Sequence, residues 1–258
     1  MWVPSRLMKG LDDVCGCFPT GRHYPGIADI LARTVVQVAG LVRELAADRV
    51  WATQSFCVID FETTGLDAEK ERVVEMGVVI FEGGIVTSRR QWLINPEMPI
   101  PAESQAVHGI SDDDVKDAPK FRDLAAELSA LLEGHLPVAY NADFDRKFLH
   151  AEFTRTGRAP GFAQPPALRP DVVWIDPLVW VRELQKYEKG KKLTDAAARL
   201  GIALDNAHRA DADAEAAGRV LLALAPQMPG TYGELVRLQG LYAARQETEL
   251  QAWRSRKT

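Results

Sequence analysis

Hydrophobic runs of strand length fill the middle of the chain. Strands are predicted at SFCVIDF (55–61), RVVEMGVVIF (72–81), GIVTSRRQWLI (84–94), LPVAYNA (136–142) and DVVWID (171–176). The pair Gly83-Gly84 separates the second run from the third and is typical of a tight hairpin turn. We therefore expect the sheet to open with antiparallel strands.

Helical periodicity alternates with the later strands. Amphipathic patterns predict helices at 120–132, at 143–157, after Pro177, at 192–202 and at 208–225. The stretch 158–170 holds four prolines and is predicted to be a loop. Three strands followed by alternating helices and strands predict an α/β fold with a mixed central sheet, antiparallel opening strands and helices on both faces.

Both ends of the chain are expected to be helical appendages. One apolar stripe runs through residues 27–47 and another through 232–253. We accordingly divide the chain into an N-terminal extension with an amphipathic helix (1–52), a central domain (53–226) and a C-terminal helical tail (227–258). The terminal helices are candidates for binding a protein partner or for self-association.

Composition narrows the class of protein without identifying it. The 258 residues are 47% hydrophobic, and their formal net charge is −5, so they do not form a strongly basic nucleic-acid-binding chain. Asp12 and Asp13 interrupt the N-terminal region, and no segment suits a bilayer, so we expect a cytoplasmic protein without membrane contact.

Four segments carry side chains that could form one site. Asp60 and Glu62 alternate along the first strand and so point to the same side of it. Asp145 follows a buried strand at the start of a helix, and the segment HRADADA places His208 and Asp213 at the start of another. Ligands of such sheets commonly lie at strand ends and helix starts. Each residue alone also has an ordinary explanation as a solvated face or a helix cap.

Together, the motifs DFETTGL, NADFD and HRADADA resemble the DEDD exonuclease superfamily, in its DnaQ-like branch with histidine (DEDDh), which is ribonuclease H-like. The likeness covers about residues 55–225. It implies that residues 53–226 are a 3′→5′ exonuclease domain with a ribonuclease H-like fold. We expect hydrolysis of phosphodiester bonds at 3′ ends of single-stranded or frayed nucleic acid, with DNA favoured over RNA and nucleoside monophosphates released.

The resemblance also implies roles for individual residues. The family's metal ligands fall on Asp60, Glu62, Asp145 and Asp213, and its general base falls on His208. The family spacing of five residues after the histidine selects Asp213 over Asp211. The implied cofactors are two divalent cations, Mg²⁺ or Mn²⁺, and hard carboxylate oxygens suit both ions. Bound metal would hold Asp60 and Glu62 together against their mutual repulsion.

Further family positions imply contacts with the 3′-terminal nucleotide at Thr63, Thr64 and Leu66. His108 and Asn141 match family positions near the substrate. Core packing is an equal alternative for Leu66, and a local structural hydrogen bond is an alternative for His108 and Asn141. Tyr140 stands where the family usually has histidine, which leaves its role open.

Two other functions compete with a stand-alone nuclease. A proofreading, epsilon-like subunit of a DNA polymerase would need a polymerase-binding tail, and the tail after residue 230 shows no convincing binding motif. A catalytically silent nucleic-acid-binding module would have lost one of the acids or the histidine, and all five are present.

Overall fold

The chain divides into two units, Met1–Ala39 and Gly40–Thr258, and the fold of the second is described here. The computed structural model describes residues 39–204 and 209–256. The part of the predicted N-terminal helix before residue 39, and His208, lie outside these ranges.

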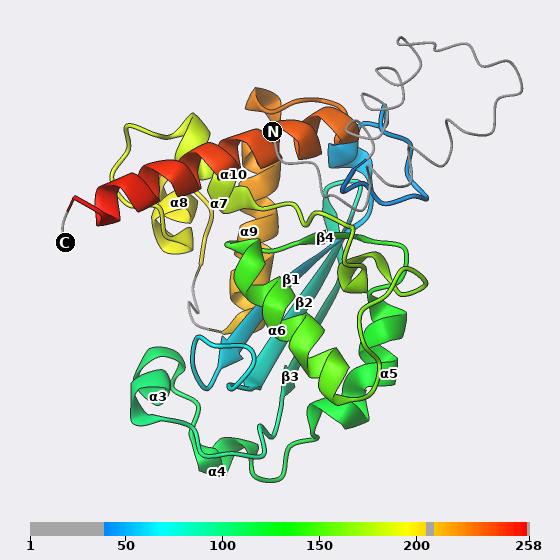
Figure 1. The fold of residues 1–258 in the computed structure, drawn as a ribbon, viewed down its shortest axis with the longest axis vertical. Helices are drawn as coiled ribbons and strands as arrows, with labels where there is room; N and C mark the ends of the chain where they lie inside the picture. Colours follow the sequence, from blue (N-terminus) through cyan, green and yellow to red (C-terminus); the bar gives the residue numbers. More distant parts are fainter. Residues whose placement is uncertain (1–38, 205–208, 257–258) are drawn as a thin grey trace, which may run out of the picture. The chain divides into compact units, whose positions relative to one another are not determined.

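A four-stranded mixed sheet forms the centre of the fold (Figure 1). Its order is β3-β2-β1-β4, with β1 (Phe56–Thr63) antiparallel to β2 (Val73–Glu82) and parallel to β4 (Leu136–Val138). Strand β3 (Ile85–Leu93) pairs antiparallel with β2 through the hairpin at Gly83-Gly84, where both residues have positive φ. The mixed sheet with an antiparallel opening is therefore confirmed.

Helices cover both faces of this sheet, as the pattern predicted. Helices α5 (Phe121–Leu131) and α6 (Ala142–Arg155) lie on one face, and α9 (Ala210–Leu224) lies against β1 and β2 on the other. Helices α7 (Pro177–Leu184) and α8 (Leu193–Arg199) pack against α9, and α10 (Tyr232–Arg254) packs against α7.

The side chains of β1 alternate between two hydrophobic clusters. Phe56 and Val58 belong to the cluster beneath α9, whereas Cys57, Ile59 and Phe61 belong to the cluster beneath α5 and α6. Because successive side chains of a strand point to opposite faces, Asp60 and Glu62 continue the row that begins with Phe56 and Val58. The acids of β1 therefore face α9.

The predicted strand at 171–176 is wrong. Only single bridges form, between Val138 and Ile175 and between Gly40 and Val172. Its remaining backbone groups find other partners, because the side chain of Gln239 accepts from the Asp176 N–H and donates to the Trp174 carbonyl. The side chain of Gln239 on α10 thus makes two hydrogen bonds that a neighbouring strand would make in a sheet.

The predicted helix at 27–47 is wrong from residue 39 onward, where the chain forms turns. Gly40 has a φ of +86°, and Leu41 and Val42 are buried in the cluster beneath α9. The Val42 N–H donates to the Tyr232 hydroxyl at 3.1 Å, so this segment packs against the start of α10. Leu41 and Val42 are thus buried in the core although this segment forms no helix.

Five short elements complete the description: η1 (Trp51–Thr53), α3 (Ala102–His108), α4 (Asp112–Val115), η2 (Pro166–Leu168) and η3 (Ala225–Gln227). Helices α3 and α4 were not predicted, because most of their side chains are exposed and leave no helical apolar stripe. Among the helices in the described ranges, none has the length and apolar character needed to cross a membrane.

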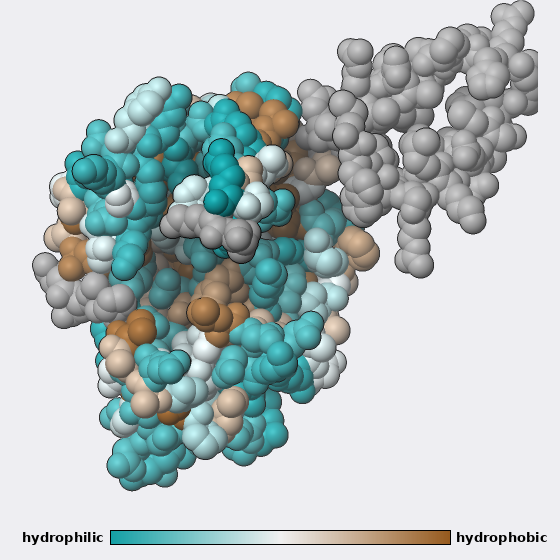
Figure 2. Space-filling model, turned by 60° about the vertical axis from the view of Figure 1, so that its left-hand side comes forward, coloured by the Kyte–Doolittle hydropathy of each residue, from teal (hydrophilic) through white to brown (hydrophobic). Residues whose placement is uncertain are grey.

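Large hydrophobic side chains that reach solvent are scattered. On the face shown in Figure 2, hydrophobic residues form separate patches within a mainly hydrophilic surface. The exposed set includes Leu66, Ile85, Phe162, Tyr187 and Trp253, from distant parts of the sequence. Leu66, which is 87% exposed, lies in the turn that follows β1.

Candidate active site

The second half of β1 brings two carboxylates to the face beneath α9. Asp60 pairs with Gly77 of β2, and Glu62 pairs with Glu75. Asp60 and Glu62 are both partly exposed, although the residues between and before them are buried. The row of side chains beneath α9 thus changes from apolar to acidic at Asp60.

Helix α9 can approach these acids closely because two glycines leave room where it contacts β2. One is Gly77 on β2, and the other is Gly218 on the helix itself. A Cβ on Gly77 would collide with the backbone of Ala210 at the start of α9. Further along the helix, a Cβ on Gly218 would collide with the ring of Phe81 on β2. The start of α9 therefore lies directly on β2, beside Asp60.

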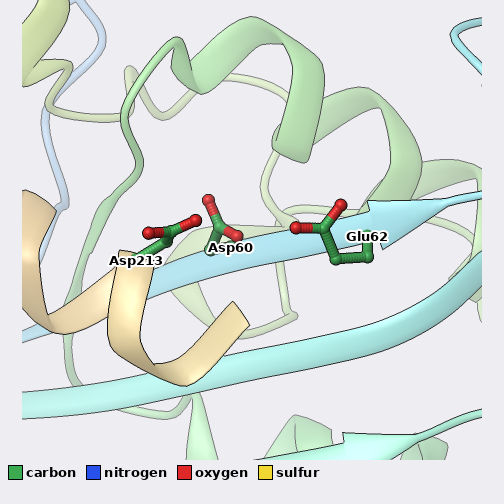
Figure 3. A group of neighbouring side chains, drawn as sticks. All are labelled: Asp60, Glu62 and Asp213. Atoms are coloured by element: carbon green, nitrogen blue, oxygen red, sulfur yellow. The ribbon is translucent and has the colours of Figure 1, made fainter. Parts of the chain in front are cut away.

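This approach places Asp213, in the first turns of α9, beside Asp60 and Glu62 (Figure 3). The three residues each offer a carboxylate oxygen, and these oxygens lie within 4.8 Å of one another. Asp211, two residues earlier, instead pairs with Arg89 at 2.7 Å. The structure thus brings Asp213, and not Asp211, to the two acids of β1.

Asp145 approaches the same strand from the opposite helix layer. It lies in the first turn of α6 and is 3% exposed. Its Oδ1 accepts a hydrogen bond from the Phe61 N–H at 3.2 Å, and Phe61 lies between Asp60 and Glu62. The sequence therefore identified four acids that converge on one stretch of β1, three of which form the close oxygen cluster.

Burial and the neighbouring carboxylates together raise the pKa values of the two acids on β1. Burial, and then the charges of neighbouring carboxylates, raise the pKa of Asp60 well above its usual value. Burial and the charge of Asp213 raise the pKa of Glu62 to about 8. Burial is also the main reason that the pKa of Asp145 is raised. A hard divalent cation fits this donor set, because it would supply positive charge to carboxylate oxygens.

The turn after β1 presents Leu66 to solvent and holds its threonines inside. Because Leu66 is 87% exposed, core packing is excluded as its role. Thr64 donates its N–H to the Arg72 carbonyl and its hydroxyl to Glu71, and Thr63 donates its hydroxyl to the Gly65 carbonyl. Both threonine side chains therefore shape the turn, and their predicted contact with a nucleotide stays a prediction.

Three other positions singled out in the sequence also make structural contacts. His108 is 7% exposed, and its Nδ1 accepts from the Ile110 N–H at 3.0 Å. Asn141 has a φ of +69°, a conformation that asparagine tolerates better than most residues. Tyr140 donates its hydroxyl to the Lys191 carbonyl at 2.6 Å. The local hydrogen bond is thus observed for His108, and substrate contacts at His108 and Asn141 stay predictions.

Sequence reasoning missed two carboxylates beside the cluster. Glu75 is 0% exposed on β2 and accepts the N–H of Ala210 at 2.9 Å. Asp176 accepts the N–H groups of Asn141 and Ala142 at the start of α6. An acid inside the apolar run VVEMGVV was the available signal for Glu75, and Asp before Pro177 was the signal for Asp176.

Comparison with known proteins points to one family. A family model described as an exonuclease, RNase_T, matches residues 57–221. The 3′-5′ exonuclease DinG of Bacillus subtilis is 35% identical over 170 residues, which cover 66% of this chain and 17% of that protein. The epsilon subunit of DNA polymerase III of Treponema pallidum is 30% identical over 167 residues, covering 62% of this chain and 71% of the subunit.

Other relatives are much longer than this chain. The PolC-type DNA polymerase III of Thermotoga maritima is 29% identical over 202 residues, which cover 78% of this chain and 14% of the polymerase. This chain therefore spans less than a fifth of the DinG and PolC-type proteins.

Solved structures share the fold. Exonuclease X in complex with 5′-overhanging duplex DNA aligns with a TM-score of 0.56 and 22% identity, covering 71% of this chain and 99% of that one. Exonuclease I of E. coli in complex with a dT13 oligonucleotide aligns with a TM-score of 0.58 and 18% identity, covering 66% of this chain and 41% of that one.

Proposed function

The chain belongs to the exonuclease family whose model matches residues 57–221, and from this premise we propose that it is a metal-dependent 3′→5′ exonuclease. The proposed reaction is hydrolysis of the terminal phosphodiester bond of single-stranded or frayed nucleic acid, with release of a nucleoside monophosphate. The observation that carries this proposal is the convergence of Asp60, Glu62 and Asp213, with oxygens within 4.8 Å, beside Asp145.

The four acids would hold two divalent cations, Mg²⁺ or Mn²⁺. When bound, such cations stabilise the attacking and leaving oxygens of an in-line phosphoryl displacement. Asp60 and Glu62 would be held by the pleat of β1, Asp213 by α9 and Asp145 by α6, so three different elements fix the ligand oxygens. The raised pKa values of Asp60, Glu62 and Asp145 support a cation-binding role, because burial of like charges is costly without a counter-ion.

His208 and Leu66 would act on the substrate. By its place in the family pattern, His208 would take the proton from the attacking water, since a neutral imidazole can accept a proton near pH 7. Leu66 would pack on the terminal nucleotide, and its exposure leaves its side chain accessible for that contact. Thr63, Thr64, His108 and Asn141 would shape the surroundings of the terminal nucleotide.

DNA is the favoured substrate. Several matched structures contain single-stranded oligodeoxynucleotides, and Exonuclease X was solved with duplex DNA. A proofreading subunit is the second candidate, because the Treponema pallidum epsilon subunit matches over 71% of its own length. In that case a polymerase would be the partner, and the exposed parts of α10 would be available to bind it.

A time course on matched 5′-labelled DNA and RNA oligomers tests the proposal. The full chain should shorten the DNA stepwise from its 3′ end with Mg²⁺ or Mn²⁺ and should stop with excess EDTA. A 3′-labelled oligomer should release its label in the first step. Undiminished hydrolysis in EDTA, or no hydrolysis with either metal, would contradict the proposal.

A further inference from the structure

Helix α9 begins without a cap from its own N-terminal residue. Its N-cap is Arg209, which has no acceptor on its side chain and makes no capping hydrogen bond. Instead, the N–H of Ala210, the first helical residue, donates to Oε2 of Glu75 on β2 at 2.9 Å. A fully buried carboxylate from a strand 135 residues away thus caps this helix.

Helix α6 begins in the same way. Its N-cap Asn141 makes no capping hydrogen bond with its side chain. The N–H of Ala142, the first helical residue, donates to Oδ2 of Asp176 at 3.2 Å, and the N–H of Asn141 donates to Oδ1 at 3.0 Å. Asp176 also caps its own helix α7 through the Leu178 N–H at 2.8 Å.

The two helices also carry their alanine and their acid at the same positions. In each, the first residue is an alanine whose N–H reaches a distant carboxylate, and the fourth is an acid of the candidate site: Asp145 in α6 and Asp213 in α9. The first N–H groups of a helix have no partner within the helix, so their external partners fix where the helix begins. The position of the fourth residue follows from that start.

We propose that Glu75 and Asp176 are positioning residues that set the two ligand-bearing helices in register with β1. This inference rests on the proposed function, because it assigns metal binding to Asp145 and Asp213. Each cap acts through one helical turn, and neither needs to touch the metal.

Each cap is itself held in place. Oε1 of Glu75 lies 2.7 Å from Nη2 of Arg209 and accepts from Nε2 of Gln91 at 3.0 Å. The N–H of Asp176 donates to Oε1 of Gln239 at 2.9 Å, and Gln239, 5% exposed, also donates to the Trp174 carbonyl. Helix α10 therefore contributes to the site through Gln239, Asp176 and Ala142, and this part of the C-terminal tail supports the site.

The chemistry of the two caps differs in a way that allows a test. Glu75 accepts one backbone N–H, so a glutamine there can keep the bond to Ala210 through its amide oxygen, while its NH₂ replaces Oε1 and loses the contacts with Arg209 and Gln91. Asp176 accepts three backbone N–H groups on two oxygens. An asparagine would turn its NH₂ either toward the Ala142 N–H or toward the Asn141 and Leu178 N–H groups, so in both orientations it would lose a bond at the start of α6.

The experiment compares Glu75→Ala, Glu75→Gln and Asp176→Asn in the full chain with Asp123→Ala. Asp123 is the matched control, because its carboxylate caps α5 by accepting the Lys120 N–H at 3.0 Å, and α5 carries no candidate ligand. Mn²⁺ binding to metal-free protein is measured by calorimetry, kcat and KM on a 5′-labelled oligomer, and folding by circular dichroism.

Glu75→Ala and Asp176→Asn should lower Mn²⁺ affinity and kcat by about tenfold or more, as is usual for partners that orient metal ligands, with KM little changed. Glu75→Gln should keep most of both, and Asp123→Ala should match wild type. Equal losses in Glu75→Gln and Glu75→Ala would show that the charge of Glu75, or its contacts with Arg209 and Gln91, matters rather than the cap, and would overturn the inference. So would folded Glu75→Ala and Asp176→Asn proteins with wild-type affinity and kcat.

The outcome also separates this inference from the proposed function. If the wild type binds Mn²⁺ but hydrolyses no oligomer, the proposed function fails, and the affinities alone still test the positioning role. If Glu75→Ala does not fold, Asp176→Asn decides the result, since it removes no side-chain atoms beyond replacing oxygen by nitrogen.

Discussion

The two faces of β1 differ sharply although they belong to the same eight residues. Beneath α5 and α6, its side chains Cys57, Ile59 and Phe61 are all apolar and buried. Beneath α9, the row Phe56 and Val58 changes to Asp60 and Glu62. The face beneath α5 and α6 therefore only stabilises the fold. The face beneath α9 ends in two carboxylates, which destabilise the fold where they lie close together.

This difference shows how the fold can hold a repulsive cluster. Apolar burial on both sides of the first half of β1 fixes the strand, so the acids at its end cannot move apart freely. Substitutions on the two faces should consequently have opposite effects: apolar truncations should cost stability and spare activity, and acid replacements should spare stability and remove activity.

The largest expected effect is that of Asp213→Asn. Loss of one ligand from the cluster should reduce hydrolysis as completely as excess chelator does and should weaken Mn²⁺ binding, with the fold retained. On the apolar face, Ile59→Val should cost about 0.5–1.5 kcal/mol of stability with near-normal activity. Both are measured by oligomer hydrolysis and by thermal unfolding.

Asp211→Asn is the control for that experiment, because Asp211 lies on the same helix and pairs with Arg89 instead of joining the cluster. It should stay active. An inactive Asp211→Asn together with an active Asp213→Asn would reverse the assignment of the ligand.

The second prediction concerns His208, which precedes the acidic face of α9. His208→Ala should keep the fold and Mn²⁺ binding and lose about 10²–10⁴-fold in kcat, the usual contribution of a general base. Its residual activity should rise with pH, as hydroxide replaces the missing base. Near wild-type kcat in a folded His208→Ala protein would instead remove His208 from the mechanism.

The third prediction tests the closeness of α9 to the acidic end of the sheet. Gly77→Ala should push the start of α9 away from β2, because its Cβ would collide with the Ala210 backbone. We expect a loss of about 1–3 kcal/mol in stability and weaker Mn²⁺ binding. Gly240→Ala in α10 is the control, since its Cβ would meet open space, and it should be neutral or slightly stabilising.

The sequence predicted the strands and the main helices because their apolar periodicity is strong. It failed at 171–176, where an apolar run resembles a strand although its backbone bonds with the side chain of Gln239. It also failed beyond residue 39, where Leu41 and Val42 are buried without a helix. A hydrophobic pattern reports burial, and burial alone does not determine which hydrogen bonds form.

The site shows the same limit. The four acids followed from motifs, yet the contacts that place them depend on pairs remote in sequence, such as Gly77 with Ala210 and Asp176 with Ala142. No local pattern encodes such pairs. Leu66 shows the same limit. In the sequence its apolar side chain fitted core packing and nucleotide contact equally well, and only its exposure in the structure excluded the core.

The fourth prediction concerns stability without metal. In chelator, Asp60→Asn should melt a few degrees above wild type, because it removes one of the repelling charges. An acid whose pKa is raised on folding destabilises the folded state above its unfolded pKa, so the wild type should lose stability as pH rises from about 4.5 to about 8, the range set by Glu62.

The advantage of Asp60→Asn should therefore shrink toward pH 5 and vanish when Mn²⁺ saturates the wild type, since the metal stabilises only the folded state that binds it. Differential scanning fluorimetry across pH, with and without Mn²⁺, checks both. An Asp60→Asn protein that unfolds would make Asp60 a structural acid.

The smallest expected effect lies at the border between the two faces, where β1 runs into its turn. Leu66 is 87% exposed, so Leu66→Ala should leave the Tm unchanged. If its side chain packs on the terminal nucleotide, the lost contact should cost about 1 kcal/mol in binding and raise KM about fivefold, with kcat little affected. Ile85→Ala, at another exposed hydrophobic residue, should leave KM unchanged. A wild-type KM in Leu66→Ala would remove Leu66 from substrate binding, and the acidic end of β1 would then have to hold its substrate through polar groups alone.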